Sequence, residues 1–137
     1  MKFSSTFFVG IHSLLMLYYY KDKIKITSNI IASSIGTNPV VVRKVLEKLK
    51  AHNLIKIDAR KEGIKISKEP NKITLLDILN ATGIVEDSLF KVYENTNKEC
   101  HIGKNINFIL YDILIETKLA MEQKLDSITI QDLIDKL

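Results

Sequence analysis

The feature of this chain that most restricts its fold is the break Gly-Thr-Asn-Pro, residues 36–39, between two helical patterns. Before the break, Ile31 and Ile35 lie four residues apart, and after it apolar residues recur at intervals of three and four, the helical period. This second series consists of Val42, Val45, Leu46 and Leu49. The chain therefore ends one helix, expected at residues 28–35, and begins another at once, expected at residues 39–52.

Each residue of the break suits a helix end or a helix start. Gly36 can take the left-handed conformation that ends a helix with little strain. Asn38 is a preferred N-cap residue, and Pro39 fits the first helical position, where no backbone N–H partner is needed. So short a connection forces a steep crossing, and the small Ala32 allows close approach. We predict a helix-turn-helix, whose second helix can enter a DNA major groove, over an αα-corner that binds nothing.

Charge is distributed unevenly along the chain. Residues 1–68 contain 13 lysines and arginines against four acidic residues, a net charge of +9. Residues 69–137 contain 7 basic and 12 acidic residues, a net charge of −5. A basic half that carries the helix-turn-helix indicates a polyanion-binding part joined to something else. A solvated lysine-rich surface would explain scattered lysines, but it explains this segregation less well.

The apolar start of the chain predicts a buried helix from Ser4 to Tyr20. Its run FFVGIHSLLMLYYY resembles a signal-peptide core, but no small-x-small cleavage site follows it, and a charged Lys-Asp-Lys does. It is also too short to span a bilayer as a helix, and we expect no membrane partner. A helix apolar on nearly every side fits between other helices. The single cysteine cannot form an intramolecular disulfide, which fits a cytoplasmic protein.

A β-hairpin is predicted directly after the helix-turn-helix. Residues 54–57 and 64–66 alternate between apolar and polar side chains, and residues 58–63 form the turn between them. A hairpin in this position is a wing, and its basic tip, Arg60 and Lys61, could reach phosphates or a minor groove. The wing favours DNA binding over a generic helical corner.

The segment Glu69-Pro70-Asn71 indicates a domain boundary. We expect a winged helix-turn-helix DNA-binding domain at residues 1–70 and a helical dimerisation and sensor region at residues 71–137. The first and last helices are expected to pack together with the DNA-binding domain. After the boundary, the similar stretches ITLLDI (73–78) and ITIQDL (128–133) each fit a helix start with a capping box.

A long helix without proline or glycine is predicted from Lys104 to about Leu125. Its apolar side chains cover more than one face. A small domain has one core to offer, so a second apolar face indicates contact with another chain. We expect a homodimer interface here, and a central core helix is the alternative. The residues expected in the interface are Ile106, Ile109, Leu110, Ile113 and Leu114.

The face of the second helix that points away from its apolar series is the predicted DNA surface. Recognition helices contact bases near their N-termini. Arg43 and Lys44 can donate to guanine or phosphate, and Val40 can pack on a thymine methyl group. Asn38 is expected to serve mainly as the cap. The predicted DNA-binding residues are Thr37, Asn38, Val40, Val41, Arg43, Lys44, Lys48, Arg60 and Lys61.

Several stretches together resemble the Rrf-two family of winged-helix transcriptional regulators, which includes IscR, NsrR and CymR types. They are MKFSSTFFVGIHSLLML, TNPVVVRKVLEKLKAHNLIKI, EPNKITLLDIL, CHIGKNI and SITIQDL. The resemblance runs nearly end to end. It implies a mainly α fold, a winged helix-turn-helix with a small β wing, and a long C-terminal dimerisation helix. We therefore expect a homodimeric, sequence-specific regulator of transcription, a repressor, on near-palindromic double-stranded DNA.

The chain departs from this family pattern at two places. Cluster-binding members carry three closely spaced cysteines before the long helix, whereas this chain has only Cys100. One thiolate per chain cannot supply the usual ligands of an iron–sulfur cluster, so we expect no cofactor. A zinc site from Cys100 and His101 of two chains is less expected still, because structural zinc needs four arranged ligands. In the wing, residues 61–64 replace a glycine-rich turn and its following aromatic residue, while Arg60 falls at the family's wing arginine.

Two functional alternatives accompany the regulator. Cys100 is either a passive residue or a redox sensor, since Lys98, His101 and Lys104 nearby would stabilise its thiolate. A winged helix that serves as a protein-interaction adapter would bury its basic face against an acidic partner and show no DNA sequence preference. An enzyme is not expected, because the sequence shows no nucleophile–base pair, phosphate loop or metal cluster.

Overall fold

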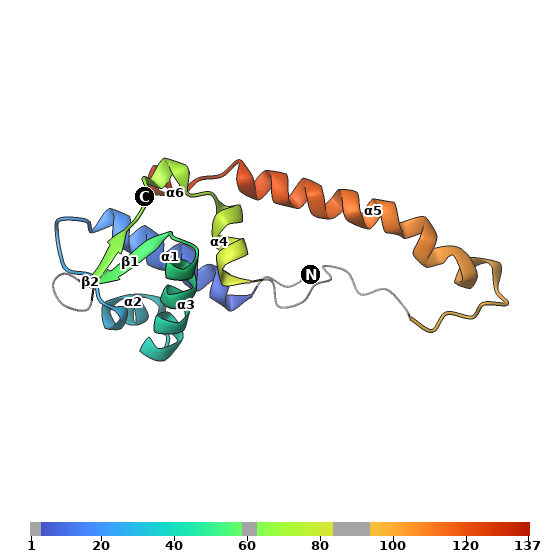
Figure 1. Cartoon of the computed structure of the whole chain (residues 1–137), viewed down its shortest axis with the longest axis horizontal. Coiled ribbons are helices and arrows are strands. Elements are labelled where there is room, and N and C mark those ends of the chain that lie inside the picture. Colours follow the sequence, from blue (N-terminus) through green and yellow to red (C-terminus); the bar gives the residue numbers. More distant parts are fainter. Residues whose placement is uncertain (1–3, 59–62, 84–93) are drawn as a thin grey trace.

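Helices dominate the computed structural model, which describes residues 4–58, 63–83 and 94–137 (Figure 1). The predicted fold class is confirmed: a helix-turn-helix is followed by a small antiparallel β wing, and a long helix lies near the C-terminus. The elements are α1 (Ser5–Tyr19), α2 (Ser28–Ile35), α3 (Pro39–Ala51), β1 (Ile55–Asp58), β2 (Gly63–Ile66), a 3-10 helix (Pro70–Lys72), α4 (Leu75–Thr82), α5 (His101–Asp126) and α6 (Ile130–Ile134).

Helix α1 lies at the centre of the compact part of the molecule, where it contacts α2, α3, α4, α6 and β2. The Oγ atom of Ser4 caps its start by accepting from the Thr6 N–H at 3.2 Å. A Cβ atom on Gly10 would lie 3.0 Å from the side chain of Thr82, so the glycine allows α4 to pack closely on α1. The expectation of a buried first helix is confirmed; its buried apolar residues are Phe7, Val9, Leu14, Met16 and Leu17.

The wing is the two-stranded antiparallel sheet of β1 and β2. Ile55 pairs with Ile66 and Ile57 pairs with Ile64, so isoleucines face one another on the strand face turned toward the core. The predicted hairpin is therefore confirmed. The predicted tip residues Arg60 and Lys61 lie outside the described residues.

The two similar stretches found in the sequence lie side by side. Thr74 and Thr129 form an isolated antiparallel bridge, and each caps its own helix in a capping box with an aspartate three residues later. Ile73 and Ile130 are completely buried, and the Ile130 N–H donates to the Ile73 carbonyl at 2.9 Å. The hydrophobic core therefore includes residues from both sides of the boundary expected near residue 70.

Helix α5 extends away from the compact part of the molecule (Figure 1). Near its C-terminal end, Met121 and Leu125 pack against the core, which holds that end in place. The helix begins at His101, three residues earlier than expected, because Gly103 lies inside the helix instead of before it. None of the helices in the described ranges combines the length and the apolar character needed to cross a membrane.

Candidate nucleic-acid interface

The turn between α2 and α3 ends α2 at Gly36. This residue has a φ of 80° and a ψ of 37°, the left-handed conformation predicted for it. The N–H groups of Gly36 and Thr37 both donate to the Ala32 carbonyl, at 2.9 and 3.0 Å. One carbonyl thus satisfies both donors, and α2 ends within a single residue.

The start of α3 is fixed by the two residues that follow. The Asn38 Oδ1 atom accepts from the Val40 N–H at 2.9 Å, and Pro39 occupies the first helical position. Both parts of the sequence prediction are confirmed. The cap and the proline thus fix where the first turn of α3 begins, and this turn carries residues that are predicted to contact DNA.

Helix α3 has one buried face and one exposed face. The apolar series predicted for its core side is buried, with at most 2% of each side chain exposed: Val42, Val45, Leu46 and Leu49. On the other side, Val40 is 49% exposed and Val41 is 38% exposed, and Arg43 and Lys44 are exposed. Two exposed valines beside two exposed cations at a helix start match a major-groove surface, which offers thymine methyl groups and guanine acceptors.

The remaining predicted contacts lie around this surface. Thr37 is half-buried and Asn38 is exposed at the turn. Lys48 lies one turn after Lys44, and its Nζ atom donates to the Thr82 carbonyl at 3.3 Å. This ammonium group therefore stabilises the C-terminal end of α4, where helix carbonyls carry partial negative charge. Its intramolecular partner distinguishes Lys48 from Arg43 and Lys44.

Helix α2 is tied to α1 by a contact that the sequence did not reveal. The Nε2 atom of His12 and the Oγ atom of Ser34 lie 2.8 Å apart. The contact joins the first helix of the helix-turn-helix to the central helix of the fold. The residues are 22 positions apart, so no local pattern could have predicted their pairing.

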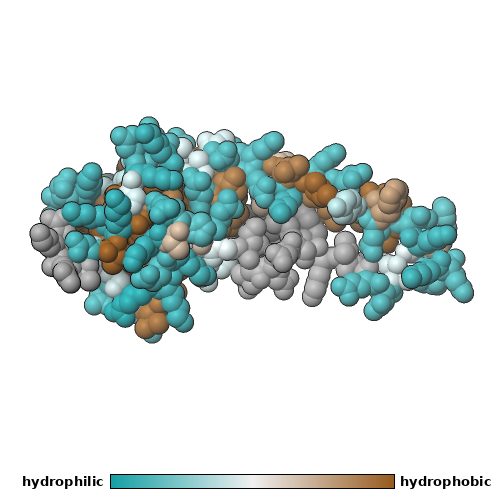
Figure 2. Space-filling model, in the orientation of Figure 1, coloured by the Kyte–Doolittle hydropathy of each residue, from teal (hydrophilic) through white to brown (hydrophobic). Residues whose placement is uncertain are grey.

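Helix α5 carries the residues predicted for a dimer interface. Ile109 and Ile113 are each 53% exposed, and Leu110 is 36% exposed, whereas Ile106 and Leu114 are half-buried. Apolar patches lie along α5 between hydrophilic residues (Figure 2).

The sequence predicts more than one apolar face on α5, but the residues predicted for the interface belong to one stripe, and a second stripe lies outside that set. By helical periodicity, this stripe lies opposite the stripe that contains Ile106 and Ile113. Its most exposed member is Phe108, at 84%. The signal was present in the sequence, because these residues also recur at intervals of three and four. The stripe consists of Phe108, Tyr111, Ile115 and Leu119.

Cys100 is exposed and directly precedes α5. The backbone N–H groups of Gly103 and then Ile102 lower the pKa of its thiol, because they stabilise the thiolate. In the described ranges, no three side chains among His, Cys, Asp and Glu are grouped as metal ligands. Because the sequence holds one cysteine, the residues near Cys100 do not fit the usual thiolate set of an iron–sulfur cluster.

Comparison with known proteins agrees with this geometry. The model of the Rrf2 (Rrf-two) family, described as an iron-dependent transcriptional regulator, matches residues 3–136. YwnA of Bacillus subtilis (strain 168), named as a candidate HTH-type transcriptional regulator, is 37% identical over 113 residues, which cover 82% of this chain and 84% of YwnA.

Solved structures share the fold. The crystal structure of a candidate DNA binding protein has a TM-score of 0.72 at 31% identity, over 95% of this chain and 99% of its own. CymR (YrzC), the global cysteine regulator of B. subtilis, has a TM-score of 0.70 at 21% identity, over 98% of this chain and 97% of its own. With the helix-turn-helix, the wing and the match over residues 3–136, the chain belongs to the Rrf2 family of DNA-binding transcriptional regulators.

Proposed function

We propose that this protein is a homodimeric repressor that binds a near-palindromic operator with the N-terminal part of α3 in the major groove. The observation that carries the proposal is the exposed pairing of Val40 and Val41 with Arg43 and Lys44 on one side of a helix whose other side is buried. A protein that occupies an operator as a dimer excludes polymerase from that stretch of DNA, which is the simplest route to repression.

The four residues have different roles in this proposal. Arg43 and Lys44 donate to guanine acceptors or to phosphates, and Val40 and Val41 contact thymine methyl groups. Arg60 and Lys61, outside the described residues, are proposed to contact phosphates or the minor groove from the wing. Lys48 is proposed to contribute less, because its ammonium group already donates to the Thr82 carbonyl.

The exposed apolar stripes of α5 support the dimer. A second copy would cover side chains such as Ile113 and Phe108, which are 53% and 84% exposed in the single chain. Two copies would place two α3 helices on one duplex, and a two-fold symmetric protein binds a two-fold symmetric site. The expected operator therefore contains two inverted half-sites.

Selection of bound fragments from random DNA tests the proposal. We expect a two-fold symmetric motif among the selected sequences. Binding of the selected operator and of a scrambled duplex is then measured across a salt series, because each neutralised phosphate contributes about 0.9 to the slope of log affinity against log salt. Equal affinity for both duplexes at physiological salt would exclude a sequence-specific regulator and favour the protein-interaction adapter.

Single substitutions separate base contacts from phosphate contacts. Lys44→Ala and Val40→Ala are expected to cost about 1–3 kcal/mol on the operator and to relax preference at one position per half-site. Arg60→Ala is expected to weaken all sequences alike and to lower the salt slope by about one per contact. Lys136→Ala, an exposed lysine near the C-terminus, is the control and should change neither quantity.

We propose further that the regulator works without an iron–sulfur cluster, although the family description names iron. The single cysteine supports this, since one thiolate per chain cannot supply the usual ligands. Protein purified without air should be colourless and should bind the operator with full affinity. Visible absorbance that is lost together with DNA binding on exposure to air would contradict the proposal.

A thiol-based redox sensor is a second candidate function, favoured by the lowered pKa of Cys100. An exposed thiol that is more readily ionised reacts faster with oxidants such as peroxide. Peroxide should then change operator affinity in the wild type and not in Cys100→Ser. The pH dependence of alkylation gives the thiol pKa directly, and a value at or above that of a free cysteine would remove this candidate.

A further inference from the structure

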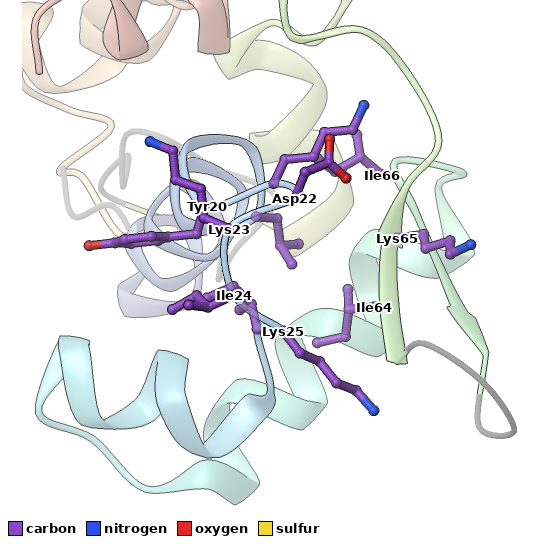
Figure 3. A pocket seen from close by; sticks show the side chains of 11 residues that line it. Tyr20, Asp22, Lys23, Ile24, Lys25, Ile64, Lys65 and Ile66 are labelled. Atoms are coloured by element: carbon purple, nitrogen blue, oxygen red, sulfur yellow. The ribbon is translucent and has the colours of Figure 1, made fainter.

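A groove of about 600 Å³ lies between the loop that follows α1 and strand β2 of the wing (Figure 3). Much of its lining is apolar. Leu17 and Ile26 are buried beneath it, and Ile64 and Ile66 of β2 are half-buried. Ile24 is 53% exposed, a large apolar surface for a loop residue. The volume falls within the range of small-molecule sites, roughly 300–1,000 Å³.

The charged residues of this groove are mostly cationic. Lys21, Lys23 and Lys25 alternate along the loop, and Asp22 is the one acidic residue in the lining that the structure describes. No carboxylate lies within ion-pair distance of these three lysines in the described part of the chain. The charge of the lining therefore favours an anion.

The lysines take different places around the groove. Lys25 extends from the loop toward the start of β2, and its Cε atom lies 3.4 Å from where a Cβ atom on Gly63 would be (Figure 3). Lys23 lies over the ring of Tyr19, with 4.6 Å between its Nζ atom and the ring centroid. Tyr19 is not part of the lining, so Lys25 is the lysine whose side chain lies between the loop and the wing.

We propose that this groove binds a small amphipathic anion, a carboxylate with an aliphatic chain, as an effector of the regulator. The aliphatic chain would cover Ile24 and Ile64, and the carboxylate would lie near Lys25. The effector role rests on the proposed DNA-binding function, whereas binding in the groove does not.

Contact with β2 is what would link the ligand to DNA binding. Ile64 and Ile66 line the groove and pair in register with Ile57 and Ile55 of β1. A ligand on these residues would favour one position of the wing, and DNA that prefers a different position would then bind less tightly. By linkage, operator DNA would weaken ligand binding by the same factor.

The groove is tested with octanoate as the probe, by backbone amide NMR of the full chain. We expect saturable shifts in residues 21–26 and 64–66, weaker shifts with octanol, which lacks the charge, and none with acetate, which lacks the chain. Ile24→Ser and Lys25→Ala should each weaken octanoate binding by about three- to tenfold. The controls are Ile115→Ser, a similarly exposed isoleucine on α5, and Lys136→Ala, and both should bind octanoate as the wild type does.

Four results would overturn the proposal or part of it. Shifts confined to α5, or an equal loss of binding in Ile24→Ser and Ile115→Ser, would show that octanoate binds exposed apolar surface without using the groove. Octanol that binds as tightly as octanoate would show that the groove does not recognise the negative charge. Octanoate that saturates the groove while operator affinity stays constant would remove the effector role, and failure to select any operator would instead count against the proposed DNA-binding function.

Discussion

Helices α3 and α5 differ in how far the single chain buries their apolar residues. Four apolar side chains of α3, a helix of 13 residues, are buried within the chain. In α5, none of the 26 residues, all of which the structure describes, is buried. The core around α1 thus buries the apolar face of α3 within one chain. The apolar surface of α5 stays exposed unless another surface covers it. The helix proposed to meet DNA is therefore the one whose position depends least on a partner.

The largest expected effect comes from a charge placed on α5. In Ile113→Asp, the dimer would bury an unpaired carboxylate, at a cost of about 3–5 kcal/mol, so the dissociation constant should rise by more than about 100-fold. Sedimentation at micromolar concentration should show a dimer for the wild type and a 15.6 kDa monomer for the variant. Gln123→Asp, at an exposed polar position of the same helix, is the control and should remain dimeric.

Phe108→Asp sharpens this experiment, because Phe108 belongs to the opposite stripe of α5. Loss of the dimer in both variants would mean that a second copy covers both stripes. Loss in Ile113→Asp alone would assign the interface to the predicted stripe. A wild type that sediments as a monomer at micromolar concentration would contradict the contrast between the two helices.

A cavity in the core of α3 is expected to act on the single chain. Leu49 is fully buried, so Leu49→Ala should lower the free energy of unfolding by about 2–5 kcal/mol at every protein concentration. Leu119→Ala, on α5, truncates a side chain that is 51% exposed. Its effect should be small and should disappear on dilution, when the dimer dissociates. Denaturant unfolding at several protein concentrations gives the free energy of unfolding of both variants. Equal losses of stability in the two variants, unchanged on dilution, would show that the apolar side chains of α5 are covered within the chain.

Local signals in the sequence predicted the elements of the fold well. Gly36 ends α2, Asn38 caps α3, and Thr74 with Asp77 starts α4, as expected. Each of these features depends on contacts between residues at most a few positions apart, and such contacts are specified by the identity of the residues involved.

Contacts between segments far apart in the chain could not be predicted from the sequence. The bridge between Thr74 and Thr129 joins residues 55 positions apart, and nothing in either stretch predicts that they pair. The sequence predicts that α5 starts at Lys104, because a glycine at position 103 suggests a break, whereas the helix starts at His101. Instead, a Cβ atom on Gly103 would lie only 2.5 Å from the Asn97 carbonyl oxygen, so the glycine allows the preceding loop to pack on the helix.

A smaller effect is expected at the start of α3. Asn38→Ala removes the oxygen that accepts from the Val40 N–H and should lower the free energy of unfolding by about 1 kcal/mol. Asn38→Ser supplies another capping oxygen and should restore most of that loss. Because the cap belongs to α3, whose apolar face is buried within the single chain, neither variant should change the dissociation constant of the dimer. Thermal unfolding and sedimentation test the two statements, and a change in dimerisation without a loss of stability would contradict them.

The smallest effect concerns pH and the attachment of α1 to the segment after the wing. The Tyr18 hydroxyl donates to the Lys68 carbonyl, and burial, followed by repulsion from Glu69, raises the pKa of Tyr18 from 10.0 to about 12. Below pH 10 the phenol is protonated in both the folded and the unfolded chain. Between pH 10 and about 12 the unfolded chain loses this proton while the folded chain keeps it, so the free energy of unfolding falls as pH rises.

Tyr18→Phe isolates this contribution, because the other groups that titrate in alkali are common to both proteins. The variant should be less stable than the wild type below pH 10, since it lacks the hydrogen bond to the Lys68 carbonyl, and the difference should shrink between pH 10 and about 12. Urea unfolding at low protein concentration measures both curves. Tyr111→Phe, on the exposed part of α5, is the control and should give a curve parallel to that of the wild type. A constant difference for Tyr18→Phe across this range would mean that the folded chain holds the phenol proton no more tightly than the unfolded chain, so that neither burial nor Glu69 raises the pKa of Tyr18.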